Sequence, residues 1–410
     1  MDLQLQKSDV NLKSQIAITG SKSETNRLLL LQALYPNLEL NNVSNSDDSL
    51  VMTKALQLEE SVIDIHHAGT AMRFLTAFFA IQEGREIVLT GSSRMQERPI
   101  SILVDALRQL GAVIEYEKNE GYPPIRISGK KLTQSKVSLQ ANVSSQYISA
   151  LLLIAPRLEN GLELILEGEL TSIPYIQMTL SLLQEIGVEI TFEGNRITVR
   201  PKSVMESKSI TVESDWSSAS YYYSIVAMAP VGTEITLSSY KENSFQGDSD
   251  LVAIYRHFGV ESVFKEDNVT LRKIAITNQE QVTFDLKNTP DIAQTIAVSC
   301  LGLHKACHLT GLHTLKIKET DRLVALQNEL TKLGAVITVT NDSLMLEASK
   351  AIKSDVAIQT YQDHRMAMAF APLAIKTSLI INEAEVVSKS YPGFWEDLRK
   401  IGFRIAEQVL

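Results

Sequence analysis

The stretch Asn328-Glu-Leu-Thr-Lys-Leu-Gly334-Ala-Val-Ile337 joins a helical pattern to a strand pattern. Leucines recur at helical spacing from Leu323 to Leu333, as on the buried side of an amphipathic helix. Gly334 then supplies the left-handed conformation that commonly ends a helix. The residues that follow alternate between apolar and polar side chains, as in a half-buried strand. The stretch therefore predicts a helix that stops at a glycine and continues directly into a strand.

Four further segments repeat this helix–glycine–strand pattern. They are Asp105–Ile114, Ser181–Ile190, Ala253–Ser262 and Asp397–Ile405. The five glycines lie 76, 72, 75 and 68 residues apart, and a degenerate sixth copy is expected at residues 47–65, where Glu59-Glu60 replaces the glycine. Six units of about 70 residues are too few and too long for a common solenoid. They fit an α/β protein of two domains with three units each, divided near Ser214-Asp215.

The bulk composition limits the class of protein. The 410 residues are 44% hydrophobic and 21% charged, which suits two globular domains. A net charge of −9 disfavours general binding to nucleic acid or to an anionic membrane. The N-terminal residues do not resemble a signal peptide, no apolar run is long enough to span a bilayer, and Cys300 and Cys307 are too few for a disulfide framework. We expect a cytoplasmic monomer without nucleic-acid or membrane partners.

The segment Lys316-Ile-Lys318-Glu319-Thr320-Asp321-Arg322 holds three cations and two carboxylates where a helix is expected to begin. Thr320 can cap that helix. Lys318 and Arg322 are four residues apart, so one helical turn can direct both toward the same ligand. The segment either lies in solvent or faces an anionic ligand with an acid/base group among the cations.

Other polar residues precede apolar helices at several places. In Gly20–Arg27, Ser21 and Glu24 have the spacing of a capping box, and the segment is either a capped surface helix or an anion site. Gly69 allows close approach of the backbone to a ligand. Asp291 either favours a helix start or acts as a base. The remaining candidates are Arg98, Ser144, Ser145, Gln146 and the segment Gln362–Arg365.

A metal or cofactor site has weak support. Cys300, His304 and His308 are spaced four apart and would share one helical face, but no second pair of ligands stands at zinc-finger spacing. Two histidines near a helix C-terminus also interact well with the helix dipole. Dinucleotide, serine-hydrolase and zincin motifs do not occur in the sequence. We therefore expect no metal and no cofactor.

Taken together, these segments resemble the 5-enolpyruvylshikimate-3-phosphate (EPSP) synthase family over the whole chain and in the family's order. The matching segments are GSKSETNR, AGTAMR, RMQERPI, SSQYISALL, SIPYI, SDWSSASYY, QGD, PDIAQTIA, KETDR, DHRMAM and SKSYPGF. The resemblance implies two domains, each of three βαβαββ units, with the active site in the interdomain cleft. It also implies that the first strand belongs to the C-terminal domain, so that residues 1–20 and 215–410 form one domain and residues 21–214 the other.

The resemblance implies transfer of the enolpyruvyl group of phosphoenolpyruvate to the 5-hydroxyl of shikimate 3-phosphate, with addition, elimination and release of phosphate. It makes Glu319 the proton donor to carbon and Asp291 the proton acceptor, with Lys22 sharing that work. Residues implied on the shikimate 3-phosphate side are Lys22, Ser23, Arg27, Ser144, Ser145, Gln146, Ser172, Asp291 and Lys318. Residues implied to hold phosphoenolpyruvate are Lys22, Gly69, Arg98, Gln146, Arg322, Arg365 and Lys389.

Charge counting agrees with such substrates. Their two phosphates and two carboxylates carry roughly −5 to −6 near neutral pH, and seven of the implied site residues are cations. Because these cations come from both halves, we expect the site to form by domain closure, and repulsion among them to favour an open form when empty. Three positions depart from the family pattern, namely His67, Phe74 and Thr314.

Two rival functions are less well supported. The UDP-N-acetylglucosamine enolpyruvyltransferase shares the implied fold but uses a cysteine in another domain, whereas Cys300 and Cys307 both lie on or near a helix of the C-terminal half. A non-catalytic repeat protein that binds an anionic metabolite would not need Glu319 or Asp291.

Overall fold

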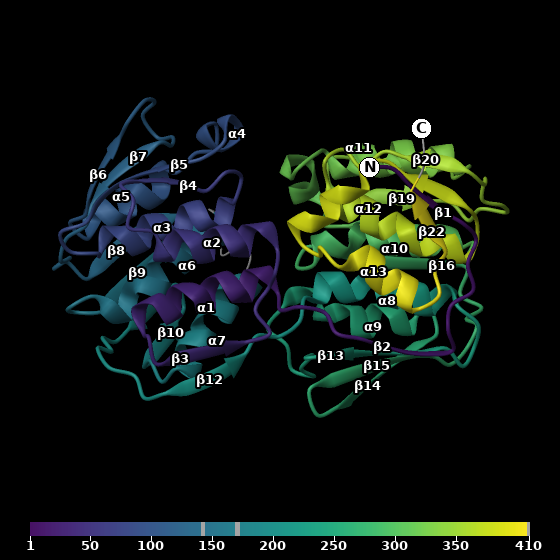
Figure 1. Cartoon of the computed structure of the whole chain (residues 1–410), viewed down its shortest axis with the longest axis horizontal. Coiled ribbons are helices and arrows are strands. Elements are labelled where there is room, and N and C mark those ends of the chain that lie inside the picture. Colours follow the sequence, from purple (N-terminus) through teal and green to yellow (C-terminus); the bar gives the residue numbers. More distant parts are fainter. Residues whose placement is uncertain (141–143, 169–172, 408–410) are drawn as a thin grey trace. The chain divides into compact units, whose positions relative to one another are not determined.

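The computed structural model describes residues 1–140, 144–168 and 173–407, which divide into two compact units (Figure 1). Unit 1 comprises Met1–Thr19 and Glu213–Leu410, and unit 2 comprises Gly20–Val212. The chain therefore passes between the units twice, at residues 19–20 and 212–213. The domain limits expected from the sequence, after residues 20 and 214, lie one and two residues beyond these breaks.

Unit 1 contains three four-stranded sheets among the described residues. Their strands are β1 (Leu3–Leu5), β2 (Lys13–Ile16), β13 (Glu234–Ser238), β14 (Val260–Lys265), β15 (Asn268–Lys273), β16 (Gln281–Asp285), β17 (Ala306–Thr310), β18 (Ile337–Val339), β19 (Leu344–Leu346), β20 (Val356–Ile358), β21 (Leu379–Ile381) and β22 (Ile405–Glu407). The α-helices are α8 (Trp216–Met228), α9 (Leu251–Arg256), α10 (Ala293–Gly302), α11 (Arg322–Lys332), α12 (His364–Phe370) and α13 (Phe394–Lys400). The 3₁₀ turns are η2 (Gly247–Asp250), η3 (Pro290–Ile292), η4 (His313–Ile317), η5 (Ala371–Ile375) and η6 (Ala384–Lys389).

Unit 2 contains two four-stranded sheets and one two-stranded sheet in its described part. Its strands are β3 (Leu38–Asn41), β4 (Val62–Asp64), β5 (Glu86–Thr90), β6 (Val113–Tyr116), β7 (Ile125–Ser128), β8 (Lys136–Gln140), β9 (Leu162–Glu167), β10 (Ile190–Glu193), β11 (Arg196–Val199) and β12 (Lys208–Thr211). Its helices are α1 (Lys22–Leu34), α2 (Asp47–Gln57), α3 (Gly69–Ala80), α4 (Ser93–Gln96), α5 (Ser101–Gln109), α6 (Ser145–Ile154), η1 (Ala155–Arg157) and α7 (Ile173–Glu185).

One strand order recurs in all five four-stranded sheets of the described residues. In the sheet β4-β5-β7-β6, the first two strands are parallel and the others form antiparallel pairs. The sheets β8-β9-β11-β10, β16-β17-β19-β18 and β2-β13-β15-β14 follow the same plan. In the sheet β20-β21-β1-β22, β1 supplies the third position and pairs with both β21 and β22. The βαβαββ repeat expected from the sequence is confirmed.

The glycine stops also behave as predicted. Gly111, Gly187, Gly259, Gly334 and Gly402 all have positive φ, between 75° and 112°, where a side chain would be strained. The sixth copy differs from the prediction. The strand after α2, which is β4, belongs to the next sheet and pairs with β5, and the two-stranded sheet β12-β3 remains as the incomplete unit. Without a glycine, α2 ends in extended backbone at Leu58.

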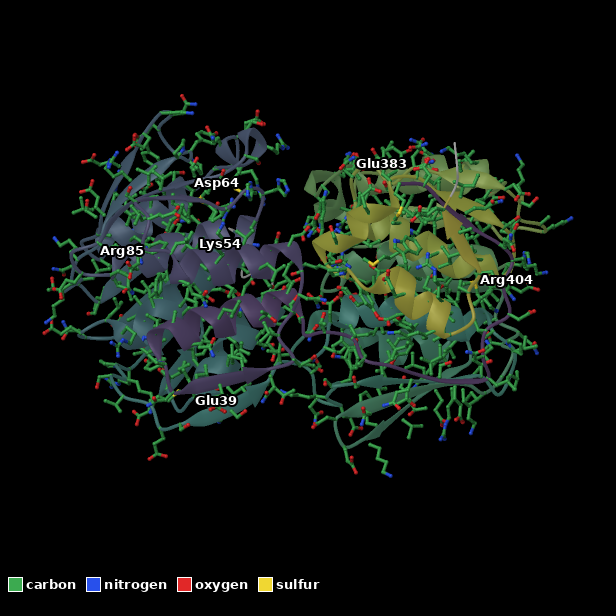
Figure 2. The ribbon with its side chains drawn as sticks, viewed as in Figure 1. Glu39, Lys54, Asp64, Arg85, Glu383 and Arg404 are labelled. Atoms are coloured by element: carbon green, nitrogen blue, oxygen red, sulfur yellow. The ribbon has the colours of Figure 1, made fainter. Side chains whose placement is uncertain are left out.

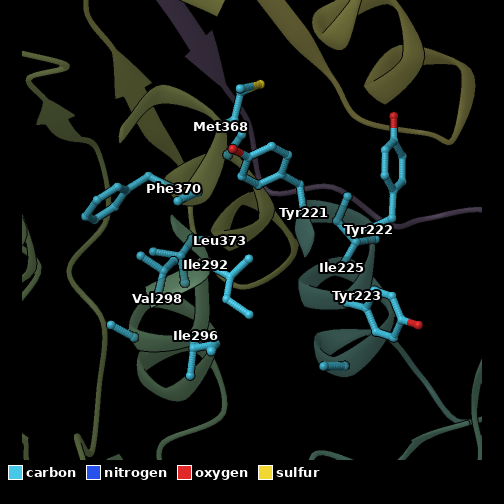
Figure 3. Packing of buried hydrophobic residues seen from close by; sticks show 14 of the residues in the cluster. Tyr221, Tyr222, Tyr223, Ile225, Ile292, Ile296, Val298, Met368, Phe370 and Leu373 are labelled. Atoms are coloured by element: carbon cyan, nitrogen blue, oxygen red, sulfur yellow. The ribbon is translucent and has the colours of Figure 1, made fainter. Parts of the chain in front are cut away.

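Helices fill the interior of each unit. Every residue of α8 and α10 is buried, including the serines of α8, so both helices lie inside unit 1. Figure 3 shows Tyr221, Tyr222 and Ile225 of α8 in the same buried cluster as Ile296 of α10. In unit 2, α3 and α6 pack together in the same way. Charged side chains such as Glu39 and Lys54 lie on the outside (Figure 2).

Candidate functional site

A carboxylate–arginine cluster in unit 1 is built around the buried side chain of Arg322. The guanidinium donates through Nε to Oδ2 of Asp363 at 2.6 Å, through Nη1 to Oδ1 of Asp291 at 2.9 Å, and through Nη2 to Oε2 of Glu319 at 2.8 Å. Arg322 is 1% exposed and Asp363 is 0% exposed. Burial by itself would lower the pKa of Arg322, but these three carboxylates raise it. One arginine therefore holds together residues from three separate segments.

Asp291 lies at the centre of this cluster. Its carboxylate contacts Nη2 of Arg365 at 3.2 Å and Nζ of Lys318 at 3.4 Å, in addition to Arg322. Burial would raise the pKa of Asp291, but the charges of Arg365, Lys318 and Arg322 hold it well below its ordinary value. Asp291 is therefore ionised at neutral pH, and three cations converge on it.

Helix starts position these side chains. Asp363 caps α12 by accepting from the backbone N–H of Arg365, and Asp291 lies in η3, immediately before α10. The cap of α11 is Asp321, which accepts from Leu323 N and Val324 N. The prediction that Thr320 caps this helix is therefore wrong.

The predicted helical turn carrying both Lys318 and Arg322 is also wrong. Lys318 follows η4 with φ −84° and ψ −148°, and α11 begins only at Arg322. The two cations meet because each contacts Oδ1 of Asp291. Lys316 points elsewhere, since its Nζ donates to Asn341.

Two further groups extend the unit 1 site. Lys389, at the end of η6, donates to the carbonyl of Gln362 at 2.7 Å, next to Asp363. The carboxylate of Asp248 accepts a hydrogen bond from the hydroxyl of Ser217 at the start of α8. Burial and the negative charge of Asp291 raise the pKa of Asp248 to about 7. Sequence reasoning named Asp363 only as part of the candidate segment Gln362–Arg365, and it missed Asp248, which lies in the QGD segment.

In unit 2, helix α1 begins at Lys22. The Nζ atom of Lys22 lies 3.2 Å from Oδ2 of Asp48 in α2. Ser23 follows it in the first turn of α1. Ser21 is the N-cap residue but makes no side-chain capping bond, so the predicted capping box with Glu24 does not form. Asp48 was another carboxylate missed from the sequence, because nothing in its own segment marks it.

Gly69 and Arg98 lie against each other in unit 2. A Cβ at residue 69 would come within 2.5 Å of Nη1 of Arg98, so a larger residue here would displace the Arg98 guanidinium. Buried Arg73 braces both segments by donating to the carbonyls of Gly69 and Pro99. Burial, together with the charge of Arg98, lowers the pKa of Arg73. This bracing arginine was not assigned from the sequence, although it closes the AGTAMR segment.

The start of α6 meets the start of α3. Gln146 donates to the hydroxyl of Thr70 at 3.1 Å, while Ser144 caps α6 by accepting from Gln146 N. Ser145 is the first residue of α6 and is buried. The N-terminal ends of α3 and α6 therefore lie at the same side of unit 2, and the dipoles of two helix starts favour an anion there. Ser172 lies outside the described residues.

Arg27 is placed differently from the other predicted anion ligands. It is 2% exposed, and its guanidinium donates to the hydroxyls of Thr179 and Ser149 and to the carbonyls of Ser23 and Tyr175. It also lies 5.4 Å from the ring of Phe74. Burial lowers the pKa of Arg27 to about 10. These contacts tie α1 to α6 and α7, so binding a substrate would compete with them.

The three positions that depart from the family pattern, His67, Phe74 and Thr314, lie in different surroundings. His67 is exposed, and Phe74 is fully buried in α3. The hydroxyl of Thr314 is buried and has no hydrogen-bond partner among the described residues. Of the three, only Phe74 is placed against a predicted site residue, which is Arg27.

Four of the cations expected to repel one another are each paired with a carboxylate of the protein, although Arg365 still opposes the charge of Arg322. Lys318, Arg322 and Arg365 are all paired with Asp291, and Lys22 is paired with Asp48. An anionic substrate must therefore compete with carboxylates of the protein for these cations.

The three potential zinc ligands noted in the sequence, Cys300, His304 and His308, do not share one helical face. Cys300 lies in α10, His304 follows the helix with φ 56°, and His308 lies in β17. The part of the chain that the structure describes contains no group of three potential metal ligands. A search of the same residues finds no helix able to cross a membrane.

Comparisons with known proteins point to one family for the chain. The family model described as EPSP synthase (3-phosphoshikimate 1-carboxyvinyltransferase) matches residues 55–398. A protein of that second name from Bacteroides fragilis is 47% identical over 96% of both chains, and one from Colwellia psychrerythraea is 35% identical over 95% of this chain and 97% of the relative.

Solved structures share the fold at lower identity. An EPSP synthase from Acinetobacter baumannii has a TM-score of 0.84 and 20% identity, covering 99% of this chain and 100% of that one. The enolpyruvyl transferase NikO from Streptomyces tendae has a TM-score of 0.74 and 13% identity, covering 99% of this chain and 98% of that one. The chain belongs to the EPSP synthase family.

Proposed function

We infer that this protein transfers the enolpyruvyl group of phosphoenolpyruvate to the 5-hydroxyl of shikimate 3-phosphate and releases phosphate, in the shikimate pathway of aromatic amino acid synthesis. The observation that carries the inference is the convergence of Lys318, Arg322 and Arg365 on one carboxylate, that of Asp291, in a chain of the EPSP synthase family. Such an arrangement suits substrates with several negative charges and a proton to remove.

Substrate binding is assigned to the cations and helix ends of both units. On the shikimate 3-phosphate side these are Lys22, Ser23, Arg27, Ser144, Ser145, Gln146, Ser172, Asp291 and Lys318. On the phosphoenolpyruvate side they are Lys22, Gly69, Arg98, Gln146, Arg322, Arg365 and Lys389. The adjacent N-terminal ends of α3 and α6 support an anion at that end of unit 2. The position of Arg27 supports a binding role least, because its donors already serve the protein.

Asp291 is proposed as the acceptor of the hydroxyl proton. In the empty site its three cations make it a weak base, since they stabilise the ionised form. A bound phosphate or carboxylate would draw Lys318 and Arg365 toward itself and so raise the proton affinity of Asp291. The substrate would thus activate its own base.

Glu319 is proposed as the proton donor to the methylene carbon of phosphoenolpyruvate. Its carboxylate is paired with Arg322, and its side chain is 37% exposed, whereas that of Arg322 is 2% exposed. Negative charge brought by the substrate would favour the protonated form of Glu319. Lys22, which is paired with Asp48, is proposed to share proton transfer at the hydroxyl. The two steps together add a proton and the shikimate oxygen across the double bond. Loss of phosphate, together with return of a proton from the new methyl group to the Glu319 carboxylate, then restores the double bond.

Phosphate release from phosphoenolpyruvate and shikimate 3-phosphate tests the function. We expect release by the wild-type protein only when both substrates are present, and folded protein without release would contradict the proposal. Lys318→Met should lower kcat/KM by about 10- to 100-fold, because a charge-assisted contact is lost. Lys316→Met is the matched control from the same segment, because Lys316 donates to Asn341 and not to Asp291.

We also propose that units 1 and 2 are the two domains of the enzyme, and that the protein is a cytoplasmic monomer. The strand pairing of β1 with β21 and β22 supports the discontinuous domain. Light scattering that gave a dimer mass would contradict the monomer.

A further inference from the structure

A second buried carboxylate in unit 1, that of Glu213, lies outside the carboxylate–arginine cluster. Glu213 is 3% exposed. Its Oε1 accepts from the indole N–H of Trp216 at 2.8 Å and from the backbone N–H of Lys241 at 2.9 Å. Its Oε2 accepts from the hydroxyl of Ser244 at 2.6 Å. The carboxylate thus joins the start of α8 to the segment 241–246.

Gln246 completes this arrangement from the other side. It is 6% exposed, its Oε1 accepts from the backbone N–H of Trp216 at 3.0 Å, and its Nε2 donates to the carbonyl of Ser214 at 3.0 Å. The same Nε2 lies 3.5 Å from Oε2 of Glu213. Glu213 and Gln246, called here the Glu213–Gln246 clamp, therefore hold the same two segments through both side chains.

On one side, the clamp adjoins both passages of the chain between the units. Glu213 is the first residue of unit 1 after unit 2. The next residue, Ser214, donates through its hydroxyl to the carbonyl of Ile18 at 2.5 Å, and Asp215 N donates to the carbonyl of Thr19 at 3.4 Å. The backbone segments that enter and leave unit 2 are therefore hydrogen-bonded to each other beside the clamp.

On the other side, the clamp adjoins the candidate active site. Asp248 is two residues after Gln246, and Ser217 is one residue after Trp216. The hydroxyl of Ser217 donates to Asp248, and α8 contacts η3, the turn that carries Asp291. The charges of Asp291 and Arg365 also act on the Asp248 carboxylate. Any shift of the clamp would move both partners of the Ser217–Asp248 bond.

We propose that Glu213 and Gln246 are positioning residues that fix Ser217 and Asp248 against the Asp291–Arg365 pair, and so link the connection between the units to the active site. The proposal rests on the proposed function, because turnover is its main readout. It assigns no contact with substrate to either clamp residue.

Stability alone does not account for a carboxylate at this position. The largest influence on Glu213 is burial, which raises its pKa despite four hydrogen-bond donors. A buried ionisable group is costly, and apolar residues often replace such groups without loss of stability. A carboxylate does offer two oxygens that accept from several segments at once, which suits a geometric role.

Steady-state kinetics of Glu213→Gln test the proposal. We expect kcat to fall about tenfold while both KM values change by less than about threefold, because the substrate contacts remain and the reacting groups are displaced. Tyr255→Phe is the matched control, since it removes a buried hydroxyl that is hydrogen-bonded to Ser299 in the same unit. It should lower the unfolding temperature but keep wild-type kcat at a temperature where both variants are folded.

A double-variant cycle separates positioning from general damage. Gln246→Met should lower kcat in the same way, and the double variant Glu213→Gln/Gln246→Met should be no slower than the worse single variant, because both act through one clamp. Wild-type kcat in both single variants, or a loss no greater than that in Tyr255→Phe, would overturn the proposal.

The indole N–H resonance of Trp216 gives a readout independent of turnover. The protein contains two tryptophans, so Trp395→Phe leaves one indole signal for assignment by ¹⁵N NMR. We expect shikimate 3-phosphate to shift this signal in the wild type and to leave it unshifted in Glu213→Gln. The same shift of the Trp216 signal in the wild type and in Glu213→Gln would overturn the proposed role of the clamp. A wild-type protein that releases no phosphate would contradict only the proposed function.

Discussion

The sites in the two units are both built from helix starts, but they balance charge differently. In unit 1, α10, α11 and α12 begin beside three carboxylates and three cations, which pair with each other around Asp291 and Arg322. In unit 2, α1, α3 and α6 begin with hydroxyls, amides and cations, with Asp48 as the ion-pair partner of Lys22. In the proposed mechanism, unit 1 therefore supplies groups that exchange protons, whereas unit 2 mainly supplies donors to an anion.

The largest expected contrast is in catalysis. Asp291→Asn should lower kcat by roughly 10²- to 10⁴-fold, the range typical for loss of a general base, whereas Asp48→Asn should lower it by less than about tenfold because it removes only the partner of Lys22. Stopped-flow or steady-state phosphate release measures both. Equal losses would mean that the two units do not divide the work in this way.

The next contrast is in stability. Arg322→Met leaves Asp363 buried without its main cation, which should cost about 3–5 kcal/mol. Arg27→Met, in unit 2, breaks hydrogen bonds to hydroxyls and carbonyls, and none of these acceptors is a carboxylate, so we expect a loss of about 1–3 kcal/mol. Urea unfolding measures both variants. If Arg27→Met proves the more damaging, the argument from buried carboxylates is wrong.

The unit 1 site should also make stability depend on pH. Asp248 has a folded pKa raised to about 7, chiefly by burial and then by Asp291, with Arg365 opposing and Asp215 adding to the shift. Because the folded state holds this proton more tightly, the stability it provides is present below the ordinary aspartate pKa and is lost as pH rises toward 7.

Asp248→Asn removes that titration. We expect it to raise the free energy of unfolding by about 1–2 kcal/mol at pH 8 and to have little effect near pH 4. Thermal unfolding at the two pH values is the measurement, and a gain that is the same at both would contradict the shifted pKa.

The smallest contrast concerns buried amides. Both side-chain polar atoms of Gln294, in α10, lack hydrogen-bond partners among the described residues, and Gln294 is 0% exposed. Gln294→Met should therefore stabilise the protein by about 1 kcal/mol. In unit 2, Asn26 accepts from Ser49 through Oδ1, so Asn26→Leu should destabilise it. A lower unfolding temperature for Gln294→Met would show that its amide is satisfied.

The repeat could be predicted because each glycine stop is local. Gly334 and the four corresponding glycines each indicate a helix end and a following strand within a few residues. Their positive φ values are those expected of a glycine that ends a helix. The cations of the site were also predictable, since Lys318, Arg322 and Arg365 stand in charged segments beside helices. The sequence does not show which residues meet at Arg322, because that depends on how distant segments of the chain pack together.

The acidic partners were harder to predict. Asp363 and Asp248 reach the cluster from α12 and η2, and spacing along the chain does not reveal which carboxylate will lie beside which arginine. Helix-capping rules failed at two helix starts. Asp321 caps α11 in place of Thr320, and the side chain of Ser21 makes no capping hydrogen bond at the start of α1. Lys318 reaches Asp291 from outside the helix, which a helical-turn argument does not anticipate.

The placement of β1 between β21 and β22 has a consequence for how the protein folds during synthesis. Strands β1 and β2, from the first 16 residues, find their partners only among strands between residues 234 and 407. Unit 2, from Gly20 to Val212, has all its described sheet partners within itself. On the ribosome, unit 2 can complete its sheets before the partners of the first two strands have been synthesised. We therefore expect these long-range strand pairs to form last and to limit the folding rate of unit 1.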